Sequence, residues 1–493
     1  MNRFTMGKNR FKSNSGAIIA YVLVFGAIAL MLLAGLLEYI IIQMRFAEQK
    51  NAWNEALGIA ESGIDYYRWC LNNEVESDCT GLFDYTDQNG AIAGKYLVEA
   101  VNSEMCGQTI SRTITSTGQT ERFPKVKRTI KVVYARESVA KYSYVLNSDV
   151  WIGGDHEING PYLSNGGIRM DGRNQSTISS AVLLDGLPEF LCYDGDPWNS
   201  DNVCDSDCPV ANGCRTASGN RCICPGVFAT TANPTTGLFR VNLPSFDFNS
   251  ITSDLGTIKK AAISSGIYLP KSTTVPGYNG VYPNKTGRGY HLVFRDNGTV
   301  EVYIVTSLGS NPANFSIAGQ DQYTTPVFTV PSACSAIYVE DDVWPEGVIK
   351  GKVTLASANL ILEDNIDTSI YLNNDITYTD NNADGLAMIA ENNVLIGKNS
   401  ENDLELRAII VAQKGKFGRN NYSGDFKDVL NIYGSVISEG RVGTQWVRTD
   451  TGQVVSGYLQ RYTYFDPGQV YNAPPFVAHT DPDFKIVSWE EIE

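Results

Sequence analysis

Residues 17–37 read AIIAYVLVFGAIALMLLAGLL, and none of these side chains carries a charge. As a helix rising about 1.5 Å per residue, this stretch is about 31 Å long, the hydrocarbon thickness of a bilayer. The leader 1–16 before it holds no acidic residue and several basic ones: Arg3, Lys8, Arg10 and Lys12. A cleaved secretory signal has a shorter apolar region followed by a small-residue cleavage site. The sequence therefore predicts a retained membrane helix with a cytoplasmic N-terminus and an exported remainder.

The same helix is predicted to continue past the membrane, because residues 38–72 contain no proline. One helical face repeats every four residues with a stripe of small and apolar side chains: Ala52, Ala56, Ala60 and Ile64, with Trp53, Leu57 and Tyr67 beside them. That spacing indicates an amphipathic surface covered by a folded domain. We therefore expect one anchor helix over residues 17–75, with its regular part ending near Asn72.

Glu38 is the first carboxylate after the apolar run. An acidic side chain inside a membrane span is a functional candidate by default. Because Glu38 lies near the end of the predicted span, we expect its side chain to reach the interface instead.

The leader ending in Gly16, the apolar helix directly after it and the AESGI segment at 60–64 together resemble type IV prepilins. Within that class the chain is similar to PilX-type minor pilins and to the large tip pseudopilin of type II secretion. The resemblance implies cleavage by a prepilin peptidase between Gly16 and Ala17. It also implies contact with membrane lipid before assembly, and with other pilin or pseudopilin subunits through the helix afterwards. Tyr21 stands where most family members carry a glutamate, which large tip pseudopilins also lack, so a low-copy or tip subunit is implied.

A small sheet is predicted over residues 76–138, because 95–101, 109–116 and 127–134 alternate apolar and polar side chains. A turn is expected at Ser116–Gly118. The cysteines near this sheet could staple it: Cys70, Cys79 and Cys106.

From about residue 139 the chain is predicted to be mainly β, which makes the fold class α+β. Apolar pieces of three to five residues separated by short turns favour a right-handed parallel β-helix, with a β-sandwich as the alternative. Similar segments occur in the C-terminal regions of large prepilin-like proteins. The predicted divisions are a first β-helical part at 139–190, insertions at 191–226 and 227–330, a second β-helical part at 331–445, and a tail at 446–493 that packs on this head. The inward side chains are expected to be Val339, Val343, Val348, Val353, Leu355, Leu360, Leu362, Ile366, Ile370, Leu372 and Ile376.

Two local signals lie in the second insertion. A helix is expected to begin near Ser250, and a hairpin is expected to turn at Asp296–Gly298.

The first insertion is cysteine-rich, and an exported chain should oxidise its cysteines. Zinc would require paired C-x-x-C spacings, which are absent from this stretch of sequence. Six cysteines allow fifteen pairings, so none is assigned from the sequence. The disulfide candidates across the chain are Cys70, Cys79, Cys106, Cys192, Cys204, Cys208, Cys214, Cys222, Cys224 and Cys334.

Residues 380–391 match the calcium-loop pattern D-x-[DN]-x-[DN]-G-x₅-E. Oxygen ligands for Ca²⁺ would come from Asp380, Asn382, Asp384 and Glu391. The flanking segments look like strands rather than helices, so an accidental match is the competing interpretation. A second acidic run could also bind a cation, although a solvated loop is the simpler interpretation: Asp194, Asp196, Asp201, Asp205 and Asp207.

Catalysis is not expected. The chain holds three histidines, far apart in sequence, and none of the usual nucleophile or phosphate-binding motifs. A polysaccharide-acting enzyme would need a carboxylate cluster, for which the candidates are Asp341, Asp342, Glu363 and Asp364. The net charge of −15 disfavours nucleic acid as a partner. The sequence thus predicts a structural minor pilin or pseudopilin without a cofactor, and the alternatives are a membrane-tethered adhesin or a polysaccharide-acting enzyme.

Overall fold

The computed structural model describes residues 15–73, 79–182, 190–191, 210–217, 221–251, 254–274, 288–360, 367–448 and 453–492. The chain divides into two compact units. The first unit comprises Met1–Ala100, Thr113–Val132 and Ser488–Glu493, and the second comprises Val101–Arg112 and Val133–Val487. A long N-terminal helix and a mainly β remainder confirm the α+β prediction at this level.

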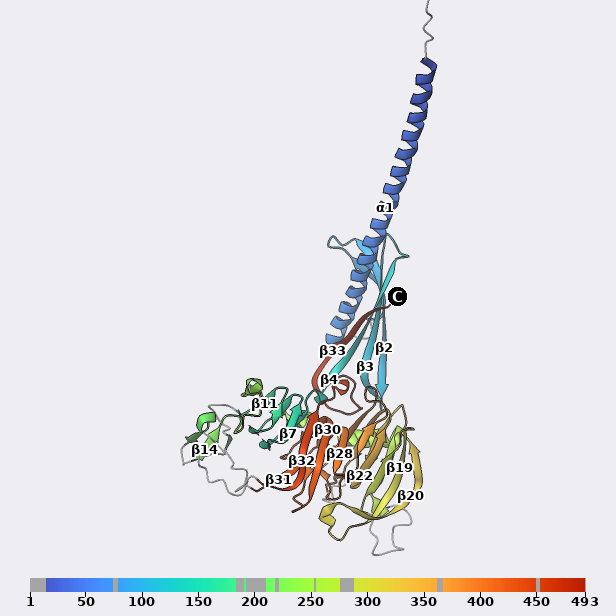
Figure 1. The fold of residues 1–493 in the computed structure, drawn as a ribbon. Helices are drawn as coiled ribbons and strands as arrows, with labels where there is room; N and C mark the ends of the chain where they lie inside the picture. The colour runs from blue at the N-terminus through green and yellow to red at the C-terminus, as the bar shows by residue number, and fades with distance from the viewer. Residues whose placement is uncertain are drawn as a thin grey trace, which may run out of the picture. The chain divides into compact units, whose positions relative to one another are not determined.

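The first unit contains helix α1 (Ser15–Asn72), which agrees with the predicted helix end at Asn72 (Figure 1). A five-stranded sheet has the order β1-β2-β3-β4-β33. Its strands are β1 (Gly81–Thr86), β2 (Ile92–Met105), β3 (Gln108–Thr120), β4 (Lys127–Ser138) and β33 (His479–Ile492). The three strands predicted at 95–134 are thus present and longer than expected.

The turn predicted at Ser116–Gly118 is wrong, because β3 runs straight through these residues. A Cβ on Gly118 would overlap the backbone of α1 at Ala56 and Ala60. Glycine is needed there for close approach of strand and helix, not for a turn. The chain reverses instead at Cys106 and Gly107, whose φ angles are 53° and 75°. Two consecutive positive φ values are typical of a tight two-residue hairpin.

The predicted tail 446–493 is divided between the two units: the chain up to Val487 belongs to the second unit, and Ser488–Glu493 belongs to the first. β33 lies beside β4 in the five-stranded sheet. Arg128 forms an ion pair with Glu491, and Lys131 forms one with Glu490 at 2.7 Å. Opposite charges on neighbouring strands stabilise this pairing.

The second unit is built from parallel strands that pair across long sequence intervals. One ladder includes, in spatial order, β17 (Ile267–Leu269), β21 (Ala336–Val339), β23 (Lys352–Ser357), β26 (Gly385–Ala390), β28 (Asp403–Ala412), β30 (Phe426–Ser438), β5 (Tyr144–Leu146), β8 (Tyr162–Ser164), β11 (Ile178–Ser180) and β16 (Phe239–Arg240). The order shows that β30, near the end of the chain, pairs with β5 at the start of the unit.

A second parallel ladder comprises β18 (Tyr290–Phe294), β22 (Val343–Ile349), β25 (Ile376–Tyr378), the first halves of β28 and β30, then β32 (Val454–Tyr464), β7 (His156–Asn159) and β10 (Arg173–Asn174). Shorter parallel runs join β22, β24 (Ile370–Leu372), β27 (Val394–Ile396) and β29 (Phe417–Arg419), and separately β6 (Val150–Ile152), β9 (Ile168–Met170) and β15 (Val227–Phe228).

Apolar side chains at matching register form the core of this unit. Direct partners along the first ladder are, in order, Ile267, Ile337, Leu355, Met388, Ile410, Val436, Tyr144, Tyr162, Ile178 and Phe239. All of them are buried except Phe239, which is partly buried. These side chains share one core with side chains of other strands, for example Leu292, Ile376 and Leu406, so neighbours along the ladder and across the core remove each from water.

The predicted inward positions are largely confirmed among the described residues. Val339, Val343, Val353, Leu355, Ile370, Leu372 and Ile376 are buried. Val348 is only half-buried, and Ile349 takes the core position instead. Leu360 is exposed, and Leu362 and Ile366 lie outside the described residues.

The predicted insertion 227–330 is not separate from the ladders, because β17 and β18 extend them. Helix α2 (Leu255–Ser265) begins after Asp254, whose side chain caps the N–H groups of Gly256 and Thr257. The predicted hairpin is present, since β18 pairs antiparallel with β19 (Thr299–Leu308), and β20 (Ile317–Thr329) follows.

The remaining elements are short. Strands β12 (Phe190–Leu191), β13 (Arg215–Ala217) and β14 (Arg221–Cys224) form a small antiparallel sheet, and β31 (Gln445–Val447) pairs with β32. Single 3₁₀ turns occur at Val139–Lys141, Val210–Asn212, Thr236–Leu238, Phe248–Ile251, Ser272–Thr274, Pro312–Asn314 and Pro467–Gln469.

Candidate functional site

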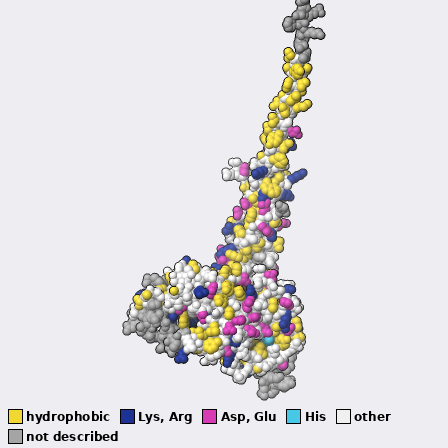
Figure 2. Space-filling view, in the orientation of Figure 1, with side chains coloured by type: hydrophobic (Ala, Val, Ile, Leu, Met, Phe, Trp, Pro, Cys, Tyr) yellow, Lys and Arg dark blue, Asp and Glu magenta, His cyan; other side chains and the backbone are white. Residues whose placement is uncertain are grey.

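The outer half of α1 is an uncovered apolar surface. Its large hydrophobic side chains from Ile18 to Phe46 are between 44% and 75% exposed. The span Ile18–Asn72 contains a window with a mean hydropathy of 2.6, none of it buried, so this helix is long and apolar enough to cross a membrane. Figure 2 shows hydrophobic side chains covering this part of the helix. Such a surface is unfavourable in water and requires lipid or protein around it.

The inner half of α1 is covered by its own sheet. Its buried positions recur at helical spacing: Ala52, Ala56, Ile59, Ala60, Gly63, Ile64, Tyr67 and Cys70. The predicted stripe of Ala52, Ala56, Ala60 and Ile64 is therefore confirmed, together with Tyr67. Trp53 is 48% exposed, and the Arg128 guanidinium lies 4.3 Å from its ring centroid. Small side chains let the strands approach the helix backbone closely, as at Gly118.

The predicted cleavage position lies in the first turn of α1, where Gly16 and Ala17 are helical, while the leader Met1–Asn14 lies outside the described residues. Glu38 is exposed in the part of the chain that the structure describes. It is 21 residues after Ala17, about 32 Å along the helix, or one hydrocarbon thickness.

Every cysteine among the described residues is in a disulfide. Cys70 pairs with Cys79, Cys106 with Cys334, and Cys214 with Cys224. Cys222 is also disulfide-bonded. The candidates Cys192, Cys204 and Cys208 lie outside the described residues. The prediction of oxidised cysteines is confirmed for the described part, and such bonds fit an oxidising compartment.

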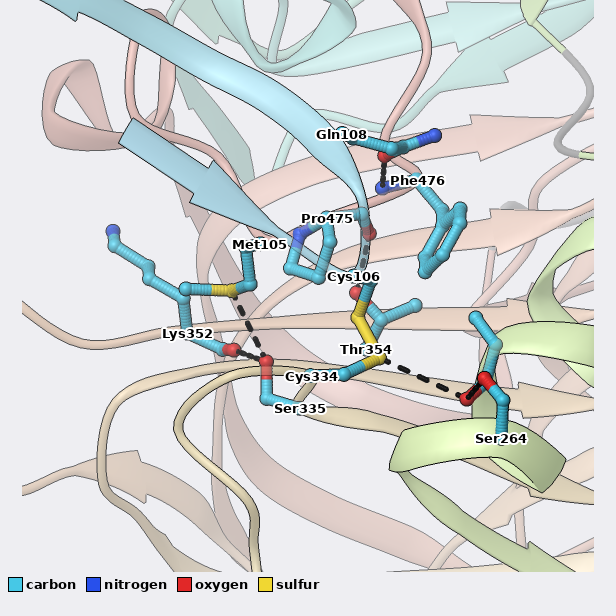
Figure 3. Close-up of a disulfide and its surroundings, with 11 residues drawn as sticks. Met105, Cys106, Gln108, Ser264, Cys334, Ser335, Lys352, Thr354, Pro475 and Phe476 are labelled. Carbon is cyan, nitrogen blue, oxygen red and sulfur yellow. Dashed lines mark hydrogen bonds between the residues drawn. A yellow bond between two sulfur atoms is a disulfide. The ribbon is translucent and has the colours of Figure 1, made fainter. Parts of the chain in front are cut away.

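The Cys106–Cys334 disulfide ties the 106–107 hairpin to the start of β21 within the second unit (Figure 3). The N–H of Cys106 donates to the carbonyl of Ala333 at 3.0 Å. Beside it, the Phe476 N–H donates to Oε1 of Gln108 at 3.0 Å, and Thr354 Oγ1 donates to the Pro475 carbonyl. Three segments far apart in sequence are thereby fixed at one place.

The predicted calcium loop is not assembled as an EF-hand. Asp384 accepts hydrogen bonds from the N–H groups of Gly351 and Asp380, both at 2.7 Å. Glu391 accepts from the Asn359 N–H and pairs with Lys414 at 2.8 Å. Strand β26 separates Asp384 from Glu391, and its six residues span about 20 Å. Asn382 lies in the Asp380 turn, so Glu391 is not brought to the other three residues. Within the described ranges, no group of three or more His, Cys, Asp or Glu side chains could hold a metal ion.

The carboxylate cluster considered for catalysis is engaged in fixing the backbone. Asp341 Oδ2 accepts from the N–H and the hydroxyl of Ser272. Asp342 Oδ1 accepts from the N–H of Ser369 at 2.8 Å. Burial raises the pKa of Asp342 to about 7, and the neighbouring Asp341 charge adds to that increase. Glu363, Asp364 and the acidic run 194–207 lie outside the described residues.

A pocket that the sequence did not predict lies within the second unit, where the last strands of that unit meet its first strands. Its volume is about 230 Å³, and its walls come from segments 144–162 and 416–461. Trp151, Tyr144 and Trp446 contribute aromatic walls, while Lys416 and Arg461 contribute charge. No motif spacing could reveal this site, because the pairings of β30 with β5 and β32 with β7 create it.

These features define a protein with one N-terminal helix capable of spanning a membrane and a mainly β remainder. No protein-family model matches the chain, and no curated protein matches it. Among solved structures it is similar to the competence-associated pilin ComZ from Thermus thermophilus, at 16% identity, over 90% of this chain and 97% of that one. The TM-score is 0.31, so the match is too distant to assign function or details of the fold.

Proposed function

We propose that this chain is a structural minor pilin or pseudopilin, a low-copy or tip subunit of a type IV pilus or type II secretion-like filament. The observation that carries the proposal is the division of α1. One half packs under the protein's own sheet through small residues, and the other exposes an apolar surface from Ile18 to Phe46. That outer surface suits lipid before assembly and the helices of other pilin subunits afterwards.

We infer that the basic leader holds the N-terminus in the cytoplasm and that a prepilin peptidase removes it between Gly16 and Ala17. The disulfides support an extracytoplasmic location for the rest of the chain. In this arrangement the chain is a single-pass protein of the inner or cytoplasmic membrane before it joins a filament. Its head would then serve filament assembly or adhesion at the cell surface.

We also infer that the ladders of the second unit are the faces of one right-handed parallel β-helix. The support is parallel pairing at matching register, for example Leu355 with Met388 and Met388 with Ile410. A β-sandwich is built mostly from antiparallel pairs, so this pairing disfavours that alternative.

We propose a non-catalytic role without a cofactor. One oxygen of Asp341 accepts from Ser272 and one oxygen of Asp342 accepts from Ser369, which supports a structural use of these carboxylates. Cleavage of a polysaccharide by the purified chain, lost in D341N/D342N, would contradict this proposal.

N-terminal sequencing of the native protein tests the proposal directly. We expect the mature chain to begin at Ala17. A Gly16→Val variant should keep Met1 because it removes the glycine at the cleavage position. The matched control is Gly26→Val, since Gly26 lies on the same exposed helix and a Cβ at this position would meet nothing within 4 Å. An intact Met1 on the wild-type protein would overturn the prepilin assignment.

A membrane-tethered adhesin outside any filament is the second candidate, because an uncovered apolar helix also suits a permanent anchor. Shearing of cells separates the two. A filament subunit should appear in the sheared filament fraction, whereas a permanently anchored adhesin should remain with the membranes.

A further inference from the structure

The pocket between the last and first strands of the second unit is built from rigid aromatic walls. Nε1 of Trp151 donates to Asp171 Oδ2, and Nε1 of Trp446 donates to the Arg419 carbonyl, both at 2.8 Å. The Arg169 guanidinium lies 4.6 Å from the Trp151 ring centroid. Trp446 remains 37% exposed. Indole rings held in this way present flat apolar surfaces to a ligand with little loss of entropy on binding.

The charge of the pocket is opposite to that of the chain. Lys416, Arg441 and Arg461 line it, and no Asp or Glu lines it among the described residues, although the chain has a net charge of −15. Arg461 is 7% exposed, with one end paired to Asp155. Its Nε has no hydrogen-bond partner among the residues that the structure describes. That enclosed Nε is a cost to the folded chain, and Arg461 presents its charge to the pocket through its other atoms.

Neutral hydrogen-bonding groups complete the site. His156 is half-buried and its Nε2 lies 3.1 Å from Thr463 Oγ1, and loss of solvent around the ring lowers its pKa well below the usual value. The ring is therefore neutral at physiological pH. Gln445 and Thr444 also line the pocket. A second hollow of about 270 Å³ shares Trp151, Gln445 and Arg461 with the pocket, and Asp155, the ion-pair partner of Arg461, lines that second hollow.

We propose that this pocket binds one acidic sugar unit, with the sugar ring on an indole face and its carboxylate at Lys416, Arg441 and Arg461. A volume of about 230 Å³ suits a single ring. The aromatic walls suit the apolar face of a sugar, and the polar groups suit its hydroxyls. A long polyanion such as nucleic acid is repelled by the net charge, whereas one carboxylate inside the pocket interacts mainly with the three nearby cations. The inference goes beyond the filament role and holds for an anchored protein outside a filament.

Ligand-observed NMR titration of the full chain in detergent micelles tests this site, with sodium glucuronate as the probe and glucose as its uncharged match. We expect glucuronate to bind at least about tenfold more tightly than glucose. Trp446→Ala should weaken glucuronate binding at least about tenfold, and Lys416→Gln about threefold or more. Matched controls are Trp489→Ala and Lys350→Gln, which change exposed residues outside the pocket and should leave binding unchanged.

Several results would overturn the proposal. Equal affinity for glucose and glucuronate would show that charge does not contribute to binding. Equal affinity for inorganic phosphate and glucuronate would show a general anion site that does not recognise a sugar ring. Unchanged affinity in both the Lys416→Gln and the Trp446→Ala variants would place binding elsewhere, whereas Trp446→Phe, which keeps an aromatic face, should retain binding. Binding of a short single-stranded DNA oligonucleotide through these residues, without binding of glucuronate, would make the pocket a nucleic-acid site.

Discussion

The two units of this protein bury their apolar side chains by different routes. In the first unit, one helix supplies small residues every turn, and antiparallel strands cover them. In the second unit, no helix lies at the centre of the core among the described residues, and parallel strands stack like side chains in register. The helix pattern can be recognised within a single segment of sequence. The ladder is complete only when β30, near the end of this unit's sequence, pairs with β5, near its start.

The largest expected difference between the units concerns their disulfides. C106S/C334S should destabilise the second unit by about 5 kcal/mol, because this bond closes a sequence separation of 228 residues. The Cys70–Cys79 bond closes a sequence separation of only 9 residues, so C70S/C79S should lower the unfolding free energy of the first unit by about 3 kcal/mol. Scanning calorimetry of the full chain in detergent measures both. Equal losses from the two bonds would show that loop length does not govern this stabilisation.

Close backbone approach provides a matched pair of substitutions. A Cβ at Gly118 would overlap the α1 backbone at Ala56, and one at Gly434, where φ is +140°, would overlap the carbonyl of Ala408. We expect Gly118→Ala and Gly434→Ala each to cost about 3 kcal/mol, the first in the first unit and the second in the second. Gly58→Ala is the control, since nothing lies within 4 Å of its Cβ position. If either substitution lowered both thermal transitions equally, the units would not unfold separately.

The second unit should show a pH dependence that comes from the buried carboxylate of Asp342. Burial raises the pKa of Asp342 from 3.8 to about 7, so its charged form is disfavoured in the folded state. The resulting cost is fully present above about pH 7 and disappears as the pH falls towards 4, so stability from this group increases with acidification. Asp342→Asn keeps an oxygen for the Ser369 N–H and should gain on the order of 2 kcal/mol at pH 8.

Thermal unfolding between pH 5 and pH 8 checks this prediction. The difference between Asp342→Asn and wild type should shrink at the lower pH. Asp296→Asn, in the exposed hairpin turn, is the control. A constant difference across the range would contradict the assignment to Asp342.

The smallest effect is expected from an exposed ion pair of the first unit. Arg122 lies 2.8 Å from Glu48, with side chains 73% and 41% exposed. Exposed pairs contribute little, so Glu48→Gln should change unfolding by no more than about 0.5 kcal/mol. A loss as large as that of Gly118→Ala would show that the strand and helix are held by charge rather than by packing.

Local chemistry made much of the first unit predictable. The stripe from Ala52 to Ile64 has helical spacing, and alternation identified β2, β3 and β4. The same reasoning misread Gly118 as a turn, because a glycine needed for close packing looks like a glycine needed for a bend. It also matched a calcium motif whose Asp384 and Glu391 lie at opposite ends of one strand.

Hydropathy and residue spacing were enough to specify the apolar anchor, the helix that continues it, the hairpin at 296–298 and most of the core positions, because these signals act over a few turns or strands. Three features required the folded chain: the bond from Cys106 to Cys334, the place of the last strand in the first sheet, and the closure of β30 and β32 onto β5 and β7. Parallel strands of similar composition can pair in many orders, and no local signal specifies the partner. The aromatic and basic pocket depends on that choice, so it exists only once the strands have paired.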